Sequence, residues 1–373
     1  MKSIHKWCYV CYEIYKDIDV GVFKKIRSQQ ESINRLEGVC DLIIYNNNAI
    51  YSLINGVENE TEYGENLYDD LVILDDYDCL YIRWGGYHKQ FNELLKIKNA
   101  KKYKIIVEIP TFPIKKELFA KAKERMKRGQ IVRGIKSLFG GIYLQDILFK
   151  AQIKNIDYLS LISYEKDVRG VKCIHIDNGI DISRYPRYVI RDTDNPIIMM
   201  IVANLSYYQG IDRIIEGLRL YKDKQSIELW IVGEGQEKDN LCQLVKKYGL
   251  QNSVRFLGVK DGKDLDDLFN ECDVAIGSLG MSREGIVRST LKTREYMARG
   301  VPFVASEYEV IGENVKNNIC IVPDNDKPIS IEEIVHYLDR IDRKLVSSKL
   351  REEAVNNLIW DIQMRKVIDG IFN

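Results

Sequence analysis

The residues best suited to chemistry lie in segment 277–306, where a loop after an apolar strand leads into a short helical segment. The helix is predicted to begin near residues 289–290 and to end at Gly300. Its first turn presents free N–H groups and the positive end of the helix dipole, which together favour a phosphate. Lys292 lies in that turn, where the dipole disfavours a cation, so it has either an anionic partner or full solvation. Glu295 follows one turn later, so both side chains can reach one end of a single ligand.

Six short apolar runs alternate with helical patterns through the second half of the chain. The predicted strands are Ile197–Ala203, Ile227–Val232, Val254–Leu257, Asp273–Gly277, Val301–Ala305 and Ile319–Val322. Continuously apolar strands separated by amphipathic helices are typical of a doubly wound parallel sheet. Such sheets bind ligands at the carboxyl ends of their strands, and the loop before Lys292 follows one of those ends.

The first half repeats this alternation less regularly. Its predicted strands are His5–Tyr12, Asp41–Tyr45, Cys79–Arg83, Tyr103–Ile109, Asp157–Ile162 and Lys172–Ile176, and its predicted helices are Val22–Glu37, Phe91–Lys98 and Ile114–Arg128. The polar stretch Ser183–Pro196 is expected to link two domains. The predicted domains are residues 1–185 and 186–350, with a helical tail, 351–373, that packs back toward the first.

Segment 295–302 resembles the GT-B glycosyltransferases, specifically the glycosyltransferase family 4 type from polysaccharide gene clusters. It matches the family motif E-x-M-A-x-G-x-P, and the resemblance continues at Val232–Gly235, Phe256–Gly258 and Asn178–Asp181. The resemblance implies an α/β fold of the GT-B type, in which two Rossmann-like domains with parallel sheets face a central cleft. It also implies that Glu295 accepts hydrogen bonds from a nucleotide ribose.

Two departures from the family pattern concern charge in the site. The family usually has a second Glu eight positions before the ribose Glu, where this chain has Val287; Glu284 of Glu-Gly-Ile is the candidate replacement. Asn204 and Gln209 stand where the family usually places an Arg and a Lys against the diphosphate. The departing diphosphate needs positive charge, so Lys292 is the candidate for that role, with Arg288 or Arg283 as helper.

The resemblance implies a metal-independent glycosyltransferase that uses a nucleoside-diphosphate sugar as donor substrate, requires no cofactor and retains the anomeric configuration. Its acceptor is expected to be a lipid-linked saccharide or another oligosaccharide that enters from the first domain. The expected catalytic residues are Glu284, Lys292 and His88, and the expected donor-binding residues are Glu295, Lys292, Arg288, Asn204, Gly21, Gly258 and Leu291. His88 is the histidine best placed to touch a sugar. Gly21, at the start of a helix, permits close backbone approach or is a plain loop glycine.

Charge and composition narrow the remaining classes of partner. Lys and Arg together number 55, as do Asp and Glu, so any electrostatic role must be local. Segment 115–136 holds nine Lys or Arg against two Glu, interleaved with apolar residues. This basic amphipathic pattern suits an anionic membrane surface, with a solvated basic helix as the alternative. Its few stacking aromatics argue against nucleic acid.

No secretory signal and no membrane-spanning apolar run is visible, which predicts a cytoplasmic protein that docks peripherally at the inner face of the membrane. The pair Cys8 and Cys11 lies in an apolar strand and is expected to be buried and reduced. The Asp-x-Asp pairs that begin at residues 17, 76, 192 and 324 are interpreted as chance matches to a metal-binding motif. Glu108 ends a strand and either positions an acceptor or pairs with a nearby cation.

Two other functions remain open at this point. A catalytically inactive GT-B scaffold would bind a sugar nucleotide or a partner without turnover. An NAD-dependent sugar-nucleotide enzyme would carry a glycine fingerprint after its first strand, but the sequence around Gly21 lacks the second and third glycines.

Overall fold

The computed structural model describes residues 4–16, 20–47, 49–64, 67–85, 88–98, 101–110, 126, 131–136, 144–162, 165–191, 196–223, 225–283 and 289–372. The chain divides into two compact units, one formed by Met1–Asp177 with Trp360–Asn373 and the other by Asn178–Ile359. The sequence placed these boundaries at 185/186 and 350/351. Within the described residues, no helix combines the length and the apolarity that crossing a bilayer requires.

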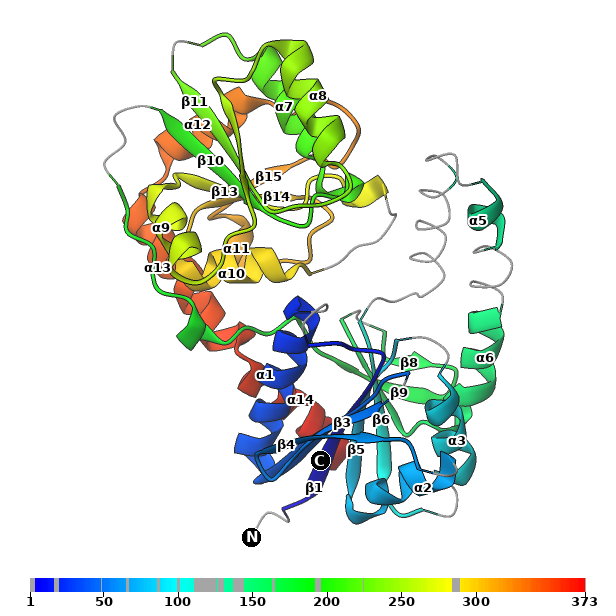
Figure 1. Ribbon diagram of the computed structural model, residues 1–373. Coiled ribbons are helices and arrows are strands. Elements are labelled where there is room, and N and C mark those ends of the chain that lie inside the picture. Colours follow the sequence, from blue (N-terminus) through cyan, green and yellow to red (C-terminus); the bar gives the residue numbers. More distant parts are fainter. Residues whose placement is uncertain are drawn as a thin grey trace. The chain divides into compact units, whose positions relative to one another are not determined.

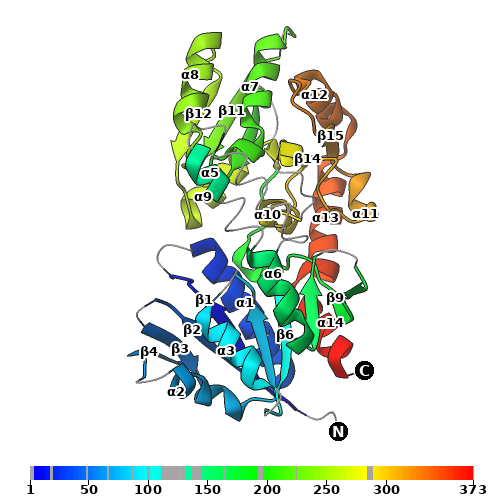
Figure 2. The same cartoon turned by 90° about the vertical axis from the view of Figure 1, so that its right-hand side faces the viewer.

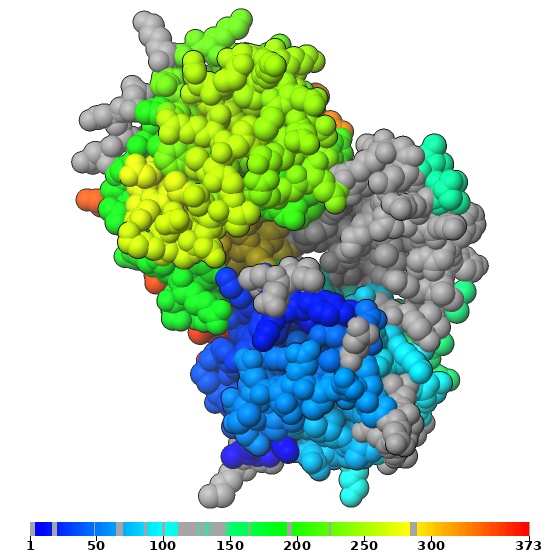
Figure 3. Space-filling view, in the orientation of Figure 1, coloured from blue at the N-terminus to red at the C-terminus, as the bar shows by residue number. Residues whose placement is uncertain are grey.

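The first unit is built on a mainly parallel sheet with the strand order β4-β3-β2-β1-β5-β6-β7-β9-β8 (Figure 1). The strands are β1 (Lys6–Tyr12), β2 (Val39–Tyr45), β3 (Ala49–Ile54), β4 (Val57–Glu62), β5 (Cys79–Arg83), β6 (Lys104–Ile109), β7 (Tyr158–Leu161), β8 (Asp167–Val168) and β9 (Val171–His175). Antiparallel pairing is confined to β3 and β4 at one edge and β8 at the other. Every residue of β4 is exposed, and this strand contributes to the blue surface of the unit in Figure 3.

Helices cover both faces of this sheet because alternate side chains of β1 point to opposite sides. Trp7, Tyr9 and Cys11 pack with α1 (Val20–Glu37) and α14 (Trp360–Phe372). The intervening Cys8, Val10 and Tyr12 pack with α2 (Leu67–Val72), α3 (Lys89–Ile97) and α6 (Leu144–Gln152). The short helix α5 (Ile131–Lys136) completes the described helices of this unit. Cys8 and Cys11 are therefore free, buried thiols on opposite faces of β1.

The second unit has an entirely parallel sheet with the order β12-β11-β10-β13-β14-β15. Its strands are β10 (Ile197–Val202), β11 (Ile227–Val232), β12 (Val254–Gly258), β13 (Val274–Ile276), β14 (Phe303–Ser306) and β15 (Cys320–Val322). The chain moves outward from β10 in one direction, then returns to place β13 on the other side of β10. The switch point, where a doubly wound sheet binds ligands, therefore lies between the carboxyl ends of β10 and β13.

Two helical layers cover the second sheet (Figures 1 and 2). One face is packed by α7 (Ile211–Leu220), α8 (Lys238–Tyr248) and α12 (Ile331–Arg340), and the other by α9 (Gly262–Glu271), α10 (Leu291–Arg299), α11 (Glu313–Lys316) and α13 (Arg343–Glu353). The covered faces explain why the strands of this unit read as unbroken apolar runs.

The described part of the expected linker, residues 183–191 and 196, belongs to the second unit. Tyr188 is buried, and its N–H donates to the carbonyl of Arg299 at 3.0 Å. Arg191 forms an ion pair of 2.7 Å with the fully buried Asp273. The polar composition did not indicate these contacts, because Tyr188 and Arg191 meet their partners only through the tertiary structure.

Candidate active site

Three elements of the second unit bring polar side chains together at its switch point. Gln209 follows β10, Ser278 follows β13, and Lys292 is the second residue of α10. The Ser278 hydroxyl donates to Gln209 Oε1 at 2.9 Å, and the Lys292 ammonium donates to the same oxygen. The site therefore holds a lysine whose ammonium donates to a neutral amide.

The surroundings of Lys292 disfavour its charge. The side chain is half-buried, and desolvation lowers its pKa from 10.5 to about 7, while the nearby Glu309 carboxylate acts in the opposite direction. Within the described part of the chain no carboxylate is hydrogen-bonded to this ammonium, and a desolvated ammonium gains stability when an anion arrives. The predicted first-turn position of Lys292 is confirmed, since α10 begins at Leu291 after its N-cap, Thr290.

Glu309 is a site residue that the sequence did not reveal. It lies in the loop after β14, and its carboxylate accepts from the Thr290 N–H at 2.7 Å and from the Thr293 hydroxyl at 2.8 Å. Burial raises the pKa of Glu309 above its usual value. Because Thr290 does not cap its own helix through its side chain, Glu309 supplies the negative partner for the start of α10.

Glu295 and Lys292 have different partners in this structure. Glu295 Oε1 accepts from Arg299 at 3.0 Å, one turn further along the same helix, and Arg299 also pairs with Asp266 at 2.6 Å. The carboxylate of Glu295 remains partly exposed. Both residues lie where the sequence expected them on α10, but their joint hold on one ligand stays a prediction.

The loops after β10 and β11 approach too closely for side chains at their glycines. A Cβ at Gly233, where φ is +130°, would lie 1.9 Å from the carbonyl oxygen of Ala203, and one at Gly235 would lie 2.4 Å from the Leu205 nitrogen. Of the other expected donor-binding residues, Asn204 is exposed, Leu291 is 42% exposed and Gly258 has a φ of +67°. All three lie at or beyond the carboxyl ends of strands or at the start of α10.

Glu284, Val287 and Arg288 lie outside the described residues. Arg283 is described, and it does not fit the role of diphosphate helper. Its guanidinium makes a bidentate pair with Asp212 at 2.7 and 2.8 Å and a further pair with Asp326 at 2.9 Å. The side chain is also only 5% exposed, so its guanidinium is both paired and shielded from a ligand.

His88 lies at the corresponding switch point of the first unit, between β1 and β5. Its Nε2 lies 3.1 Å from Glu13 Oε1, and its ring stacks on Tyr12 with centroids 4.6 Å apart. Glu13 also accepts from the Tyr15 hydroxyl at 3.0 Å and has a φ of +52°, uncommon for a residue other than glycine. A carboxylate on a strained backbone, paired with an imidazole at a strand end, forms a candidate site for a hydroxyl-bearing ligand.

The neighbouring residue Glu108 is a structural partner of cations. It is 1% exposed and accepts from Lys25 and Arg83, each at 2.9 Å. These cations hold the pKa of Glu108 at about 2, although its burial acts in the opposite direction. Gly21 is exposed on α1, and a Cβ added there would meet nothing within 4 Å, so the described part of the first unit makes no close backbone approach to this glycine.

Comparison with known proteins identifies the second unit. Residues 188–357 match the family model described as glycosyl transferases group 1. This segment is a glycosyl transferases group 1 domain. The group 1 domain contains Glu295 and also the switch-point cluster, which consists of Gln209, Ser278 and Lys292.

Sequence relatives agree with this assignment. The chain is 29% identical over 181 residues to an uncharacterized glycosyltransferase, MJ1607, of Methanocaldococcus jannaschii, covering 48% of this chain and 43% of that protein. It is 26% identical over 258 residues to the O-antigen biosynthesis glycosyltransferase WclY of Escherichia coli, covering 61% and 68%. The chain thus spans less than half the length of the first of these relatives.

The fold is shared with HepE of Anabaena, solved in complex with UDP. The two chains superpose with a TM-score of 0.63 at 12% identity, over 98% of this chain and 99% of the other. The expected GT-B architecture of two Rossmann-like domains is confirmed.

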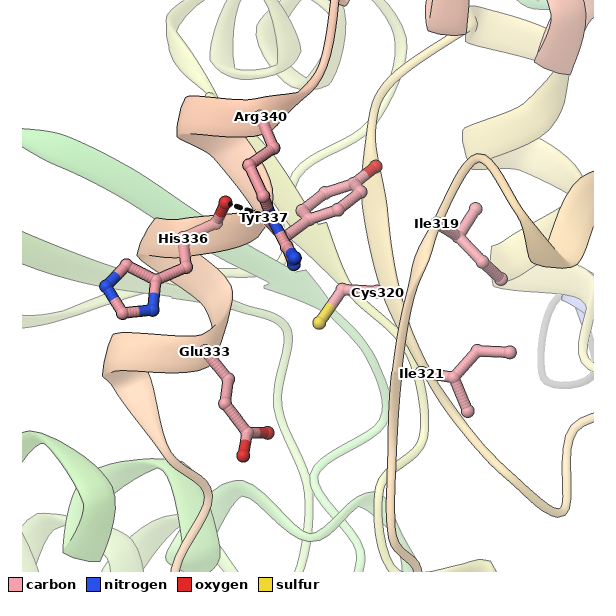
Figure 4. A pocket seen from close by; sticks show the side chains of 7 residues that line it. All are labelled: Ile319, Cys320, Ile321, Glu333, His336, Tyr337 and Arg340. Atoms are coloured by element: carbon pink, nitrogen blue, oxygen red, sulfur yellow. Dashed lines mark hydrogen bonds between the residues drawn. The ribbon is translucent and has the colours of Figure 1, made fainter.

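A cavity of about 480 Å³ in the group 1 domain lies away from the switch-point cluster. It is lined by Ile319, Cys320, Ile321, Glu333, His336, Tyr337 and Arg340 (Figure 4). Cys320 begins β15, so the cavity lies beside the amino end of a parallel strand, opposite to the end at which such sheets bind substrates. Among the described residues, no group of three His, Cys, Asp or Glu side chains is arranged to hold a metal ion.

Proposed function

We propose that the protein is a glycosyltransferase whose group 1 domain binds a nucleoside-diphosphate sugar at the switch point between β10 and β13. The observation that carries the proposal is the Lys292 ammonium, held by Gln209 and partly desolvated at the start of α10. HepE, which shares the fold, was solved with UDP and also with UDP-glucose. In the proposed complex Lys292 and the first-turn amides of α10 bind the diphosphate, and Glu295 binds the ribose.

The proposed division of roles follows from the sequence resemblance. Glu284 contacts the donor sugar, Arg288 assists at the diphosphate, and Asn204, Gly258 and Leu291 contribute to donor binding. As the bond to the sugar breaks, negative charge develops on the leaving diphosphate, and a preorganised ammonium stabilises it. The resemblance supports retention of the anomeric configuration as part of the proposal. Independence from metal ions is also proposed, because Lys292 supplies the positive charge at the diphosphate. Activity that disappears with EDTA and returns with a divalent cation would contradict the latter.

The acceptor is proposed to bind the first unit beside Glu13 and His88, with Gly21 on the neighbouring helix. A carboxylate and an imidazole supply hydrogen-bond acceptors and donors suited to sugar hydroxyls. The O-antigen assignment of WclY supports a saccharide acceptor in glycan assembly, and the acceptor is proposed to be lipid-linked.

A lipid-linked acceptor requires access to a membrane surface, and segment 115–136 is proposed to provide it at the inner face. Most of that segment lies outside the described residues. In its described part, α5 exposes Ile131, Val132 and Ile135 by 57%, 68% and 44%. Co-sedimentation with phosphatidylglycerol vesicles but not with phosphatidylcholine vesicles would support the proposal, and equal binding to both or to neither would contradict it.

The decisive experiment is a thermal-shift panel of nucleotides and nucleotide sugars, followed by assays of nucleoside diphosphate release. A ligand that binds only the folded state raises its melting temperature. We expect one nucleoside diphosphate and its sugar to stabilise the protein, and release to fall in Lys292→Ala and Glu295→Ala. Binding without any release would instead support the inactive scaffold, and stabilisation by NAD would support the dehydrogenase-like alternative.

A further inference from the structure

One Asp-x-Asp pair interpreted as a chance match, at 324 and 326, has a specific structural environment. Asp324 follows β15 and is 6% exposed. Its Oδ2 accepts from the Met281 N–H at 2.8 Å, and its Oδ1 accepts from the Ser282 N–H at 3.1 Å and the Ser282 hydroxyl at 2.6 Å. Oδ2 also accepts from the Ser306 hydroxyl at 2.5 Å. All four of these bonds are donated to the carboxylate, so Asp324 acts as an acceptor in each.

The segment that Asp324 holds is the loop of the candidate donor site. In loop 277–283 the Leu279 N–H donates to the Gln209 carbonyl at 2.9 Å, and the Gly280 N–H donates to the Tyr208 carbonyl at 3.1 Å. The Ser278 hydroxyl donates to Gln209 Oε1, which also binds Lys292. The loop therefore joins the switch-point cluster at one end and continues in the chain to Glu284 at the other.

A second buried charge fixes the same loop from α7. Arg213 is 2% exposed and donates to the carbonyl oxygens of Leu279, Pro323 and Lys327. Arg213 and Asp324 thus bind the loop after β13 to the loop after β15 through main-chain atoms. Such bonds set the position of the backbone rather than only the packing of side chains.

We propose that Asp324 is a positioning residue for sugar transfer, which fixes loop 277–283 so that the donor sugar meets its catalytic partners. This inference rests on the proposed function. Misplacement of a catalytic segment by about 1 Å costs on the order of a hundredfold in rate. Loop 277–283 directly precedes Glu284, the proposed partner of the donor sugar, in the chain, so its displacement should affect the sugar more than the nucleotide.

The test compares Asp324→Asn with the matched control Asp326→Asn. Asn at 324 keeps the shape but directs an NH₂ group at backbone N–H donors. The Asp326 side chain is 74% exposed, and its ion pair among the described residues is with Arg283, which retains Asp212. The assay uses the nucleotide sugar that stabilises the wild type in the thermal-shift panel. At saturating donor, we expect Asp324→Asn to lower the transfer rate at least tenfold. The dissociation constant of the nucleoside diphosphate should stay within twofold, and Asp326→Asn should change neither quantity more than twofold.

Ser282→Ala provides a milder variant should Asp324→Asn fail to fold, since it removes one of the four donors and leaves the carboxylate in place. We expect a threefold to tenfold slower transfer with unchanged nucleoside diphosphate binding. A folded Asp324→Asn or Ser282→Ala with the wild-type rate, or one that loses nucleotide affinity in parallel with rate, overturns the inference. A wild type that binds no nucleoside diphosphate at all overturns the proposed function instead.

Discussion

Lys292 and Gln209 are 83 residues apart in the sequence, and the ammonium of the first donates to the side-chain oxygen of the second. They meet because α10 and the loop after β10 converge at the switch point of one parallel sheet. The sequence resemblance implies a Lys at the position of Gln209 in the family, so the proposed source of positive charge in this site is a different element, α10. The pair therefore makes specific predictions about ligand binding.

Donor affinity should depend on the protonation of Lys292. Its pKa of about 7 in the free protein means that the ammonium is charged below pH 7 and loses its proton above it. Binding of a diphosphate favours the charged form, so affinity should fall as the pH rises from 7 to 9, by at most about tenfold per pH unit for one coupled proton. Titration calorimetry at several pH values measures this slope. Lys292→Gln should remove it, and an unchanged slope in that variant would show that another group titrates.

The stability of the first unit should depend strongly on Glu108. Glu108→Gln leaves Lys25 and Arg83 buried without their carboxylate, which we expect to cost about 3–5 kcal/mol of unfolding free energy. The exposed pair of Glu93 and Lys96 provides the matched control, and Glu93→Gln should change stability by less than about 0.5 kcal/mol. Urea unfolding measures both, and similar midpoints for the two variants would refute the assigned role.

The same carboxylate gives stability a pH dependence in acid. The pKa of Glu108 is lowered from 4.5 to about 2 in the folded protein, so its contribution is fully present above pH 4.5. It should be lost progressively as the pH falls from 4.5 toward 2, because the unfolded chain then binds a proton that the folded protein does not. Melting temperatures of the wild type and Glu108→Gln should converge over this range, and a constant gap would contradict the shift.

Gly233 should tolerate no side chain. In Gly233→Ala, where φ is +130°, the Cβ would approach the Ala203 carbonyl oxygen to 1.9 Å, while Gly249, where φ is +69°, has nothing within 4 Å of an added Cβ. We expect the Gly249 variant to lose about 1–2 kcal/mol through the left-handed backbone alone. The Gly233 variant should lose roughly 1–3 kcal/mol more through overpacking and should bind nucleotide more weakly. Equal unfolding midpoints would mean that the two loops can separate without cost.

Substitutions of Glu13 and His88 should impair the use of the acceptor but not the binding of the donor. With a glycolipid extract as acceptor, His88→Ala and Glu13→Gln should slow sugar transfer about tenfold or more, a loss typical of a positioned hydrogen-bonding group. The dissociation constant for the nucleoside diphosphate should stay within twofold, since both residues belong to the first unit. His336→Ala, at the cavity beside β15, is the control and should be neutral. Weaker nucleotide binding in the Glu13 or His88 variants would place them at the donor instead.

The second unit was predictable from the sequence because its strands are covered on both faces. Each of its six strands appears as an apolar run, and the turn at Gly300 ends α10 as expected. The hairpin of β3 and β4 was missed because β4 reads Val-Glu-Asn-Glu-Thr-Glu and buries no residue, so hydrophobicity gives no signal. The segment from 183 was misjudged because buried polar contacts such as Arg191 with Asp273 have no sequence pattern.

The candidate site was predictable only where its residues are neighbours in the sequence. Lys292 and Glu295 were found from a helix start and a motif. Gln209 contacts Lys292, Ser278 contacts Gln209, and Glu309 contacts the start of α10, each from a different loop. A single sequence does not show such contacts. Asp324 was dismissed as a chance motif because four hydrogen bonds to one carboxylate depend on tertiary structure alone.

In the proposed donor complex, the Lys292 ammonium binds the diphosphate. The most direct test is the ratio of dissociation constants for a nucleoside and its diphosphate, measured by calorimetry at pH 6.5 in the wild type, Lys292→Gln and the control Lys238→Gln, whose ammonium pairs with Glu234 at 2.6 Å on the surface. We expect the diphosphate advantage to fall at least about tenfold, or 1.4 kcal/mol, in Lys292→Gln alone. A Lys292→Gln protein that keeps the full advantage would contradict the claim.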